Sequence, residues 1–282
     1  MAIGNFVPEY WSAKLLTALR AKARYTQAGI INRNYEGDIT RAGDTVHITS
    51  FSDPTIDDYS KGSTTISYPV LTDATRSLLI DQAKYWSFSV DDIDTRQALD
   101  GFVPEVTAGA ASGLQLAADT HVSGLMVDGV DVDNDLGAET VGSTTGDAYD
   151  LLVELRTTLT RAEVPADGRF VVVPPEYYGV LLKDDRFVRA DASGTTAGLR
   201  NGVVGRAAGF DVIEGTTVPE TSGGAYQVIA GHPMATTYAD QIVKTEAIRL
   251  ERRFEDGVRG LHVYGAKVIR PTALALATVT VS

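Results

Sequence analysis

The 282-residue chain has no cysteine and only four histidines. Without cysteine it cannot form disulfides, zinc–thiolate sites, iron–sulfur clusters or a cysteine nucleophile. The histidines, at positions 47, 121, 232 and 262, lie too far apart in the sequence for a local two-histidine metal motif. We therefore expect no metal centre and no cofactor.

Basic charge and long apolar runs are also scarce. Lys and Arg total 25 against 37 Asp and Glu, which gives a net charge of −12 at pH 7. This excess of negative charge argues against a protein that coats duplex nucleic acid through phosphate contacts. No apolar run reaches the ~18 residues of a membrane span, and no signal-peptide pattern opens the chain. We expect a soluble intracellular protein with no membrane contact.

Motifs for catalysis are missing too: there is no P-loop, no GxGxxG and no GxSxG. The run Asp131, Asp133 and Asp135 is similar to a calcium loop, but Leu136 replaces the required glycine and Gly142 replaces the final acid. We interpret it as a solvated acidic turn. Since no acid and base are brought together by spacing, we do not expect an enzyme.

The first 34 residues predict an arm. Pro8 suits a helix start, and the helical spacing of Trp11, Leu15 and Leu19 forms one apolar stripe. Arg20 and Arg24 contribute to the most basic part of an acidic chain. Because a lone amphipathic helix must bury its stripe, the arm packs either on its own domain or on a neighbouring subunit.

Residues 35–75 predict a long two-stranded finger. Apolar residues alternate over 46–51 and again over 66–70, and the polar, turn-rich segment 53–64 lies between them. An isolated hairpin is at best marginally stable in water, so the finger is expected to touch a partner rather than stand as a plain surface hairpin. The candidate contacts at its tip are Asp57, Asp58, Tyr59 and Lys61.

The rest of the chain mixes helices and strands, which predicts an α+β protein. A strand over 76–90 precedes a slim helix over 104–127, whose expected buried stripe is Val106, Ala110, Leu114, Ala117, His121 and Leu125. Residues 128–146 predict a loop between two lobes. The second lobe predicts helices from Asp147 and from Pro174–Pro175, and short strands over 170–173, 210–213 and 226–229.

Long strands return at the C-terminal end of the chain. The pattern predicts strands over 242–251, 258–270 and 274–281, with a turn at Asp256–Gly257. We therefore predict that the second lobe is an insertion between two halves of a first lobe.

This order of elements resembles the tailed-bacteriophage major capsid (coat or head) proteins, whose fold is shared with herpesvirus shells and encapsulins. The most specific stretches are 170–187, 204–213 with Val218–Pro219, and 254–271. The opening residues 6–11 and the segment 41–46 before the finger are also similar to phage coats. The resemblance covers most of the chain.

The resemblance implies the phage major-capsid fold, with an N-terminal arm (1–34) and an E-loop hairpin (35–75). The peripheral domain would be 76–146 and 241–282, with the spine helix at 104–127, and the inserted axial domain would be 147–240. Assembly contacts would then involve Trp11, Leu15, Leu19, Arg20, Arg24, Asp57, Asp58, Tyr59 and Lys61. Some families crosslink through a finger lysine, but we interpret Lys61 as an exposed solubilising residue.

The function implied is that of a structural protein of the virion. Copies would self-assemble through pentamers and hexamers, in the bacterial cytoplasm, into an icosahedral head around double-stranded DNA that is not bound by sequence. Because the arm begins almost at Met1, we expect a separate scaffolding protein or none; portal and decoration proteins are further partners. Two alternatives stay open: an encapsulin-like nanocompartment shell, and an α+β enzyme or ligand-binding module.

Overall fold

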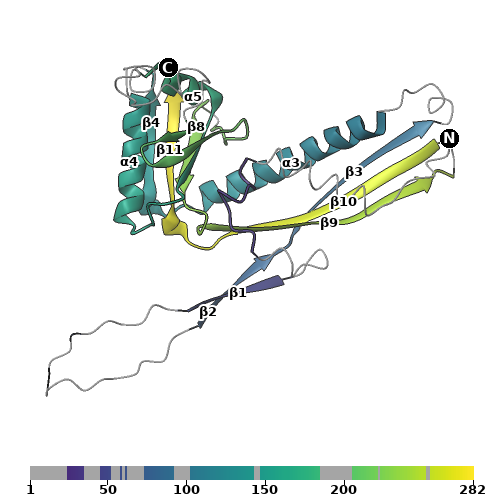
Figure 1. Cartoon of the computed structure of the whole chain (residues 1–282), viewed down its shortest axis with the longest axis horizontal. Coiled ribbons are helices and arrows are strands. Elements are labelled where there is room, and N and C mark those ends of the chain that lie inside the picture. The colour runs from purple at the N-terminus through teal and green to yellow at the C-terminus, as the bar shows by residue number, and fades with distance from the viewer. Residues whose placement is uncertain are drawn as a thin grey trace.

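The computed structural model describes residues 24–34, 45–51, 58, 61, 73–91, 102–142, 147–184, 205–221, 223–251 and 255–282. Within these ranges it has three parts: a compact lobe, a long sheet covered by a helix, and a projecting hairpin (Figure 1). The predicted α+β class is confirmed. The predicted arm helix before Arg24 lies outside the described residues.

The long sheet has three strands in the order β3-β10-β9, all antiparallel. Its strands are β3 (Gln82–Asp91), β9 (Thr236–Arg249) and β10 (Glu255–Val268). Helix α3 (Phe102–Asp128) runs along one face of this sheet (Figure 1). Trp86 of β3 packs against Ala111 and Leu114 of α3, so every second residue of the sheet faces the helix.

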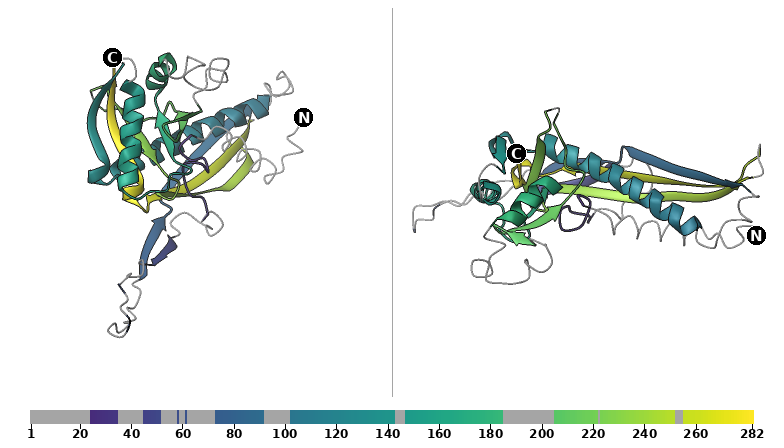
Figure 2. Two further views of the ribbon diagram at one scale, coloured as in Figure 1. Left: turned by 60° about the vertical axis from the view of Figure 1, so that its left-hand side comes forward. Right: turned by 90° about the horizontal axis from the view of Figure 1, so that it is seen from above.

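The predicted finger is present as an antiparallel hairpin whose strands are β1 (Thr45–Phe51) and β2 (Asp73–Leu79). Its second described strand lies at 73–79, and the strand expected over 66–70 lies outside the described residues. The single strand expected over 76–90 is in fact two strands, because the chain leaves the hairpin at Ile80 and Asp81 and then enters β3. Figure 2 shows the hairpin pointing away from the rest of the molecule.

The compact lobe is built on a six-stranded mixed sheet in the order β4-β11-β8-β5-β7-β6. Helices α4 (Asp147–Arg161) and α5 (Pro175–Lys183) pack on it, as their apolar spacing predicted. The strands are β4 (Asp135–Val141), β5 (Phe170–Val173), β6 (Arg206–Ala207), β7 (Phe210–Glu214), β8 (Tyr226–Gly231) and β11 (Leu274–Val281). Two short 3-10 helices, η2 (Val132–Asn134) and η3 (Pro271–Ala273), precede β4 and β11.

One apolar core joins the lobe to the near end of the long sheet. The same cluster of buried residues holds Val172 of the six-stranded sheet, Met126 of α3 and Tyr264 of β10. Tyr25, Ile30 and Ile31 belong to it as well. The segment 24–34 is therefore part of the folded body, and any arm begins only before Arg24.

Sheet pairing moves the domain limits expected from sequence. Residues 128–146 were interpreted as a connecting loop, but they contain β4, which pairs in parallel with β11. Strand β11, which was assigned to the peripheral domain, lies in the six-stranded sheet instead. The glycine-containing, acidic sequence of 128–146 hid a strand at the edge of the sheet, where alternating exposed positions give only a weak apolar pattern.

Two local expectations were also wrong. Asp256–Gly257 is not a turn: both residues lie inside β10, paired with Arg249 and Ile248 of β9. The buried face of α3 is shifted by about one residue from the expected stripe, because polar Gln115 and Asp119 are buried in it. The buried positions of the helix are Ala111, Leu114, Gln115, Ala118, Asp119, Val122, Ser123 and Met126.

Candidate assembly surfaces

The structure describes three of the nine candidate contact residues. Arg24, Asp58 and Lys61 are all exposed. Trp11, Leu15, Leu19, Arg20, Asp57 and Tyr59 lie outside the described residues, so their proposed contacts stay predictions. Arg24 stands at the root of the arm, whereas Asp58 and Lys61 belong to the segment that joins β1 to β2.

The hairpin has little to stabilise it within one subunit. Among the described strands β1 pairs only with β2, and Leu79 near its base is 51% exposed. A small cluster anchors the base, in which Leu78 and Ile80 pack against Ala239 and Val263. The Lys267 ammonium also donates a hydrogen bond of 2.7 Å to the Ser77 carbonyl. An isolated two-stranded ribbon is marginal in water, so this hairpin needs a further surface to cover it.

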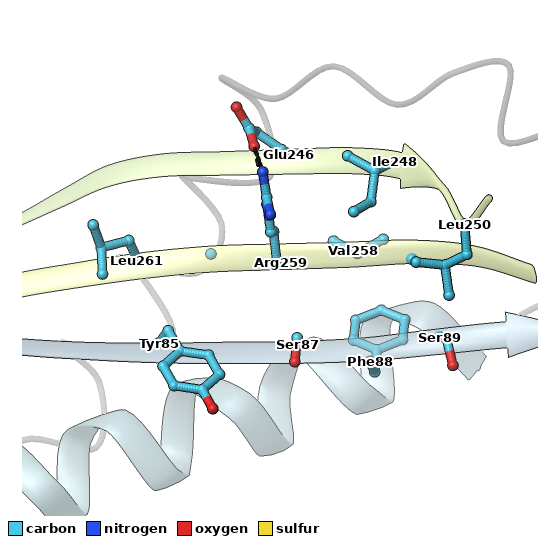
Figure 3. Close-up of a pocket in the computed structure, with 12 residues that line it drawn as sticks. Tyr85, Ser87, Phe88, Ser89, Glu246, Ile248, Leu250, Val258, Arg259 and Leu261 are labelled. Atoms are coloured by element: carbon cyan, nitrogen blue, oxygen red, sulfur yellow. Dashed lines mark hydrogen bonds and ion pairs between the residues drawn. The ribbon is translucent and has the colours of Figure 1, made fainter. Parts of the chain in front are cut away.

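A complementary surface exists on the open face of the three-stranded sheet, which we call the open sheet face. It consists of the side chains that alternate with those facing α3, including Tyr85, Leu261 and Ile248 (Figure 3). These residues border a groove of about 810 Å³. Tyr85 is 79% exposed. Large apolar side chains gathered on an exposed surface are typical of protein–protein contacts.

An ion pair crosses the open sheet face. The Arg259 guanidinium donates two hydrogen bonds, of 3.0 and 2.7 Å, to Oε2 of Glu246 on the neighbouring strand. Because the Arg259 side chain is 58% exposed, the pair adds on the order of 0.2–1 kcal/mol or less to subunit stability. Its fixed geometry supplies both a donor and an acceptor to any chain that lies on this face.

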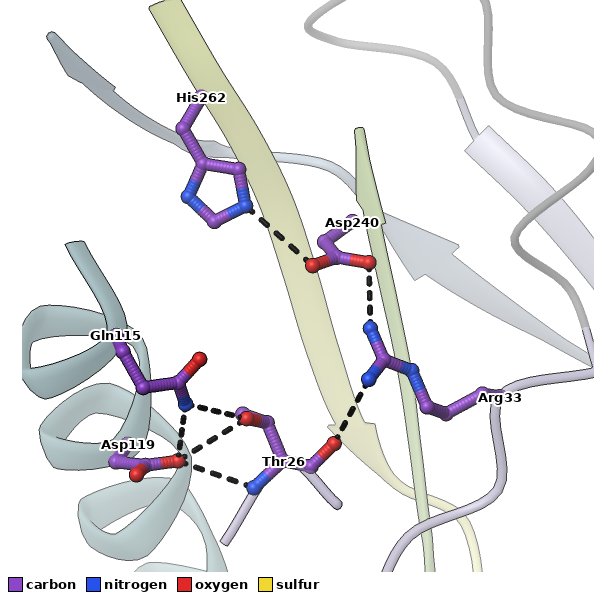
Figure 4. A network of polar contacts seen from close by, with 6 residues as sticks. All are labelled: Thr26, Arg33, Gln115, Asp119, Asp240 and His262. Atoms are coloured by element: carbon purple, nitrogen blue, oxygen red, sulfur yellow. Dashed lines mark hydrogen bonds and ion pairs between the residues drawn. The ribbon is translucent and has the colours of Figure 1, made fainter. Parts of the chain in front are cut away.

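The root of the arm is held on α3 by one carboxylate. Asp119 accepts hydrogen bonds of 3.0 Å from the backbone N–H groups of Arg24 and Thr26, and further ones from the Thr26 hydroxyl and the Gln115 amide (Figure 4). Burial raises the pKa of Asp119, and these hydrogen bonds only partly offset that effect. The network fixes Arg24 and Thr26 on α3, and the preceding residues are attached at this point.

A second polar cluster ties the same segment to the long sheet. Arg33 donates to the Thr26 carbonyl at 3.0 Å and to Asp240 Oδ1 of β9 at 2.6 Å. Nε2 of His262 on β10 lies 3.5 Å from Asp240 Oδ2 (Figure 4). Burial acts to raise the pKa of Asp240, but His262 and Arg33 outweigh it and lower that pKa to about 2. Asp240 is therefore held in its charged form.

Sequence reasoning missed these polar anchors. Gln115 and Asp119 are four residues apart, and this spacing places them on one helix face. Apolar periodicity does not reveal such a pair, because both residues are polar. Arg33 and Asp240 are 207 residues apart, and nothing local in the sequence links them.

The described residues contain no group of three or more His, Asp or Glu side chains placed to hold a metal ion. None of the helices in these ranges combines the length and the apolarity that a bilayer crossing requires.

Comparison with solved structures gives many matches. A protein of Mycobacterium phage Che8 is 34% identical, with 91% of each chain covered and a TM-score of 0.74. The capsid structure of cyanophage P-SCSP1u matches at 13% identity and a TM-score of 0.69, over 86% of this chain and 85% of that one. A virus-like particle from Pyrococcus furiosus matches at 13% identity and a TM-score of 0.54, over 96% and 98%. The last two likenesses concern the fold alone.

Family comparison points the same way. The model of a family described as phage capsid protein matches residues 73–277, which is well over half of the chain. No curated protein matches the sequence. The family match and the Che8 likeness agree with the helix-backed sheet, the projecting hairpin and the compact lobe described above. The chain therefore belongs to the phage capsid protein family.

Proposed function

We propose that this structural major capsid protein builds the icosahedral head of a tailed double-stranded DNA phage, with pentamers and hexamers as its units. The observation that carries the proposal is that one subunit has both a hairpin that forms a separate two-stranded sheet and an open sheet face with large apolar side chains. The hairpin and the open sheet face each have few contacts within one subunit, and a second copy of the chain can supply those contacts. The 34% identical Che8 protein supports a phage head over a cargo shell.

In this assembly the hairpin of one copy lies on the open sheet face of the next. The hairpin tip with Asp57, Asp58, Tyr59 and Lys61 and the arm with Trp11, Leu15, Leu19, Arg20 and Arg24 serve these contacts, either by touching the neighbouring copy or by positioning the residues that do. Apolar burial contributes roughly 25 cal/mol per Å², so an interface of ~2,000 Å² would hold a permanent assembly.

The proposal also covers the enclosed DNA and the other proteins of the head. The net charge of −12 suits a wall that encloses DNA without binding it by sequence, because strong phosphate contacts would hinder packing and release. The proposal includes assembly in the host cytoplasm and contacts with separate scaffolding, portal and decoration proteins. It includes no catalytic step.

Tyr85→Asp tests the proposal. Because Tyr85 is 79% exposed, the change should leave subunit folding intact, whereas a charge placed in the interface should reduce the assembled fraction by about tenfold, equal to ~1.4 kcal/mol. Sedimentation and electron microscopy measure assembly, and circular dichroism measures folding.

Val132→Asp is the matched control, since Val132 is 86% exposed on η2, away from the open sheet face. It should assemble as the unmodified chain does. Normal particles from Tyr85→Asp would remove the role proposed for this face.

A further inference from the structure

A cleft of about 520 Å³ lies beside α3 at the point where the described chain begins. One wall is the helix surface formed by Gly109, Ser112, Gly113 and Leu116. Thr216 and Thr217, which follow β7, form the other wall, and Arg24 lies at the edge. The cleft is separate from the open sheet face, because it shares none of its residues.

The helix wall of the cleft carries small residues, and no described part of the subunit packs closely against its glycines. A Cβ added at Gly109 or Gly113 would meet no atom within 4 Å. Each glycine in a helix is destabilising relative to alanine, and no contact at the Cβ position with the described residues explains its use here. Leu116, which follows Gly113 on α3 and also lines the cleft, is 54% exposed. Small residues next to an exposed leucine allow another chain to approach the helix closely.

Two buried polar atoms of the walls also lack partners. The side chain of Gln115 is 98% buried, since only 2% of the residue is exposed, and its Nε2 donates to Thr26 and Asp119. Its Oε1 accepts nothing from any described residue, and the same holds for the Thr217 hydroxyl. A buried carbonyl left without a donor is destabilising, because it has lost its hydrogen bonds to water and gained none in return. The cleft therefore lacks a donor that an incoming chain could supply.

The occupant is indicated by where the described chain starts. The 23 residues before Arg24 are attached at the edge of the cleft, and Asp119 holds the Arg24 N–H at 3.0 Å. Tethering gives such a segment an effective concentration that a second molecule reaches only at millimolar levels. The sequence of this segment contains Leu16 and Leu19, which are apolar like the exposed Leu116.

We propose that the cleft holds the base of the arm, residues 16–23, of the same subunit. The base covers Leu116 and the glycine surface, and it brings a donor to Gln115 Oε1. Leu19 and Arg20 then act by aiming the arm, while Trp11 and Leu15 extend beyond the cleft toward a neighbouring copy. The inference concerns the isolated subunit, so it stands or falls apart from shell assembly.

Disulfide trapping tests this directly, because the chain has no cysteine of its own. Leu19→Cys combined with Ser112→Cys should form a disulfide within one chain, since a bridge needs Cα atoms within about 7 Å. The control pairs Leu19→Cys with Thr120→Cys, an exposed α3 position next to the anchoring Asp119 but outside the cleft. Dilute, unassembled subunits should oxidise about tenfold faster with Ser112→Cys, equal to ~1.4 kcal/mol of preference.

Equal rates for the two pairs would overturn the proposal, because a loose tether samples both positions. A disulfide found only between chains, in a mixture of the two single-cysteine variants, would overturn it in favour of a neighbour's arm. Brief trypsin digestion of the subunit gives a second readout. Cleavage after Arg20 and Lys22 should be slow in the unmodified chain and fast in Gly113→Leu, because Gly113 lines the cleft and a Cβ added there meets no atom within 4 Å. Equal cleavage in both would contradict the proposal.

Discussion

Two buried carboxylates, Asp119 and Asp240, fasten the segment 24–34 to the body in different ways. Asp119 accepts hydrogen bonds from the backbone, and its pKa is raised because burial dominates. Burial also acts on Asp240, but its pKa is lowered because His262 and Arg33 outweigh that effect. Segment 24–34 is therefore held by two carboxylates of opposite behaviour. The environment of Asp119 disfavours its charged form, whereas the environment of Asp240 favours its charged form.

The pH dependence of stability should reveal Asp240. A carboxyl whose pKa is lower in the folded than in the unfolded state stabilises the fold above its unfolded pKa, near 4, and loses that effect as the pH falls toward about 2. The contribution is on the order of 2 kcal/mol. Urea unfolding of unassembled subunits should therefore show a shallower loss of stability between pH 5 and 2.5 for Asp240→Asn than for the unmodified chain.

Asp211→Asn is the control, because the Arg206–Asp211 pair is exposed on both sides. This variant should follow the pH dependence of the unmodified chain. Identical slopes for Asp240→Asn and the unmodified chain would contradict the role given to Asp240.

At the scale of elements, the sequence predicted those helices and strands that are determined by a local residue pattern. The apolar spacing of α4, the four consecutive apolar residues of β5 and the prolines before α5 each identified their element. The misses have non-local causes. Strand β4 is defined by its pairing with β11, 140 residues later, and the buried face of α3 is set by hydrogen bonds to Thr26. The same distinction holds for the candidate contact surfaces. The exposure of Asp58 and Lys61 could be predicted from the polar, turn-rich sequence around them. The open sheet face could not, because it depends on how three distant strands pair.

Gly260 of β10 has a packing role in the long sheet. The Trp86 indole lies across Gly260, so that an added Cβ would come within 2.6 Å of its Cε2 atom. The absence of a side chain at this position therefore leaves room for a large side chain from the next strand.

Gly260→Ala should lower the free energy of unfolding by about 1–3 kcal/mol, because Trp86 must move out of a packed site. Gly124→Ala is the matched control on α3, where an added Cβ meets no atom within 4 Å, and it should raise stability by up to ~1 kcal/mol. Urea unfolding of both variants measures the difference. Two changes of the same sign would count against the close packing of Trp86 on Gly260.

At the scale of the whole molecule, the subunit combines one continuous core with extensions that the core does not cover. Residues 24–34 and the six-stranded sheet share that core, whereas the hairpin is anchored only at its base. Folding and assembly should therefore be separable properties.

Deleting residues 53–64, which lie between β1 and β2, tests that separation. The deletion removes no residue of the main core, so the subunit should keep its circular dichroism spectrum and unfolding midpoint within error. Closed particles should be lost, because the tip no longer reaches a neighbour. Particles of normal size from the deleted chain, seen by negative-stain microscopy, would refute the role of the finger.

The most direct test of the account is a cryo-electron microscopy reconstruction of the full chain expressed alone or with its scaffolding protein. We predict closed icosahedral shells in which the β1–β2 hairpin of each copy covers Tyr85 and Leu261 on the open sheet face of the next. A chain that remains monomeric at every concentration, with its own hairpin folded back on its own sheet, would contradict the account.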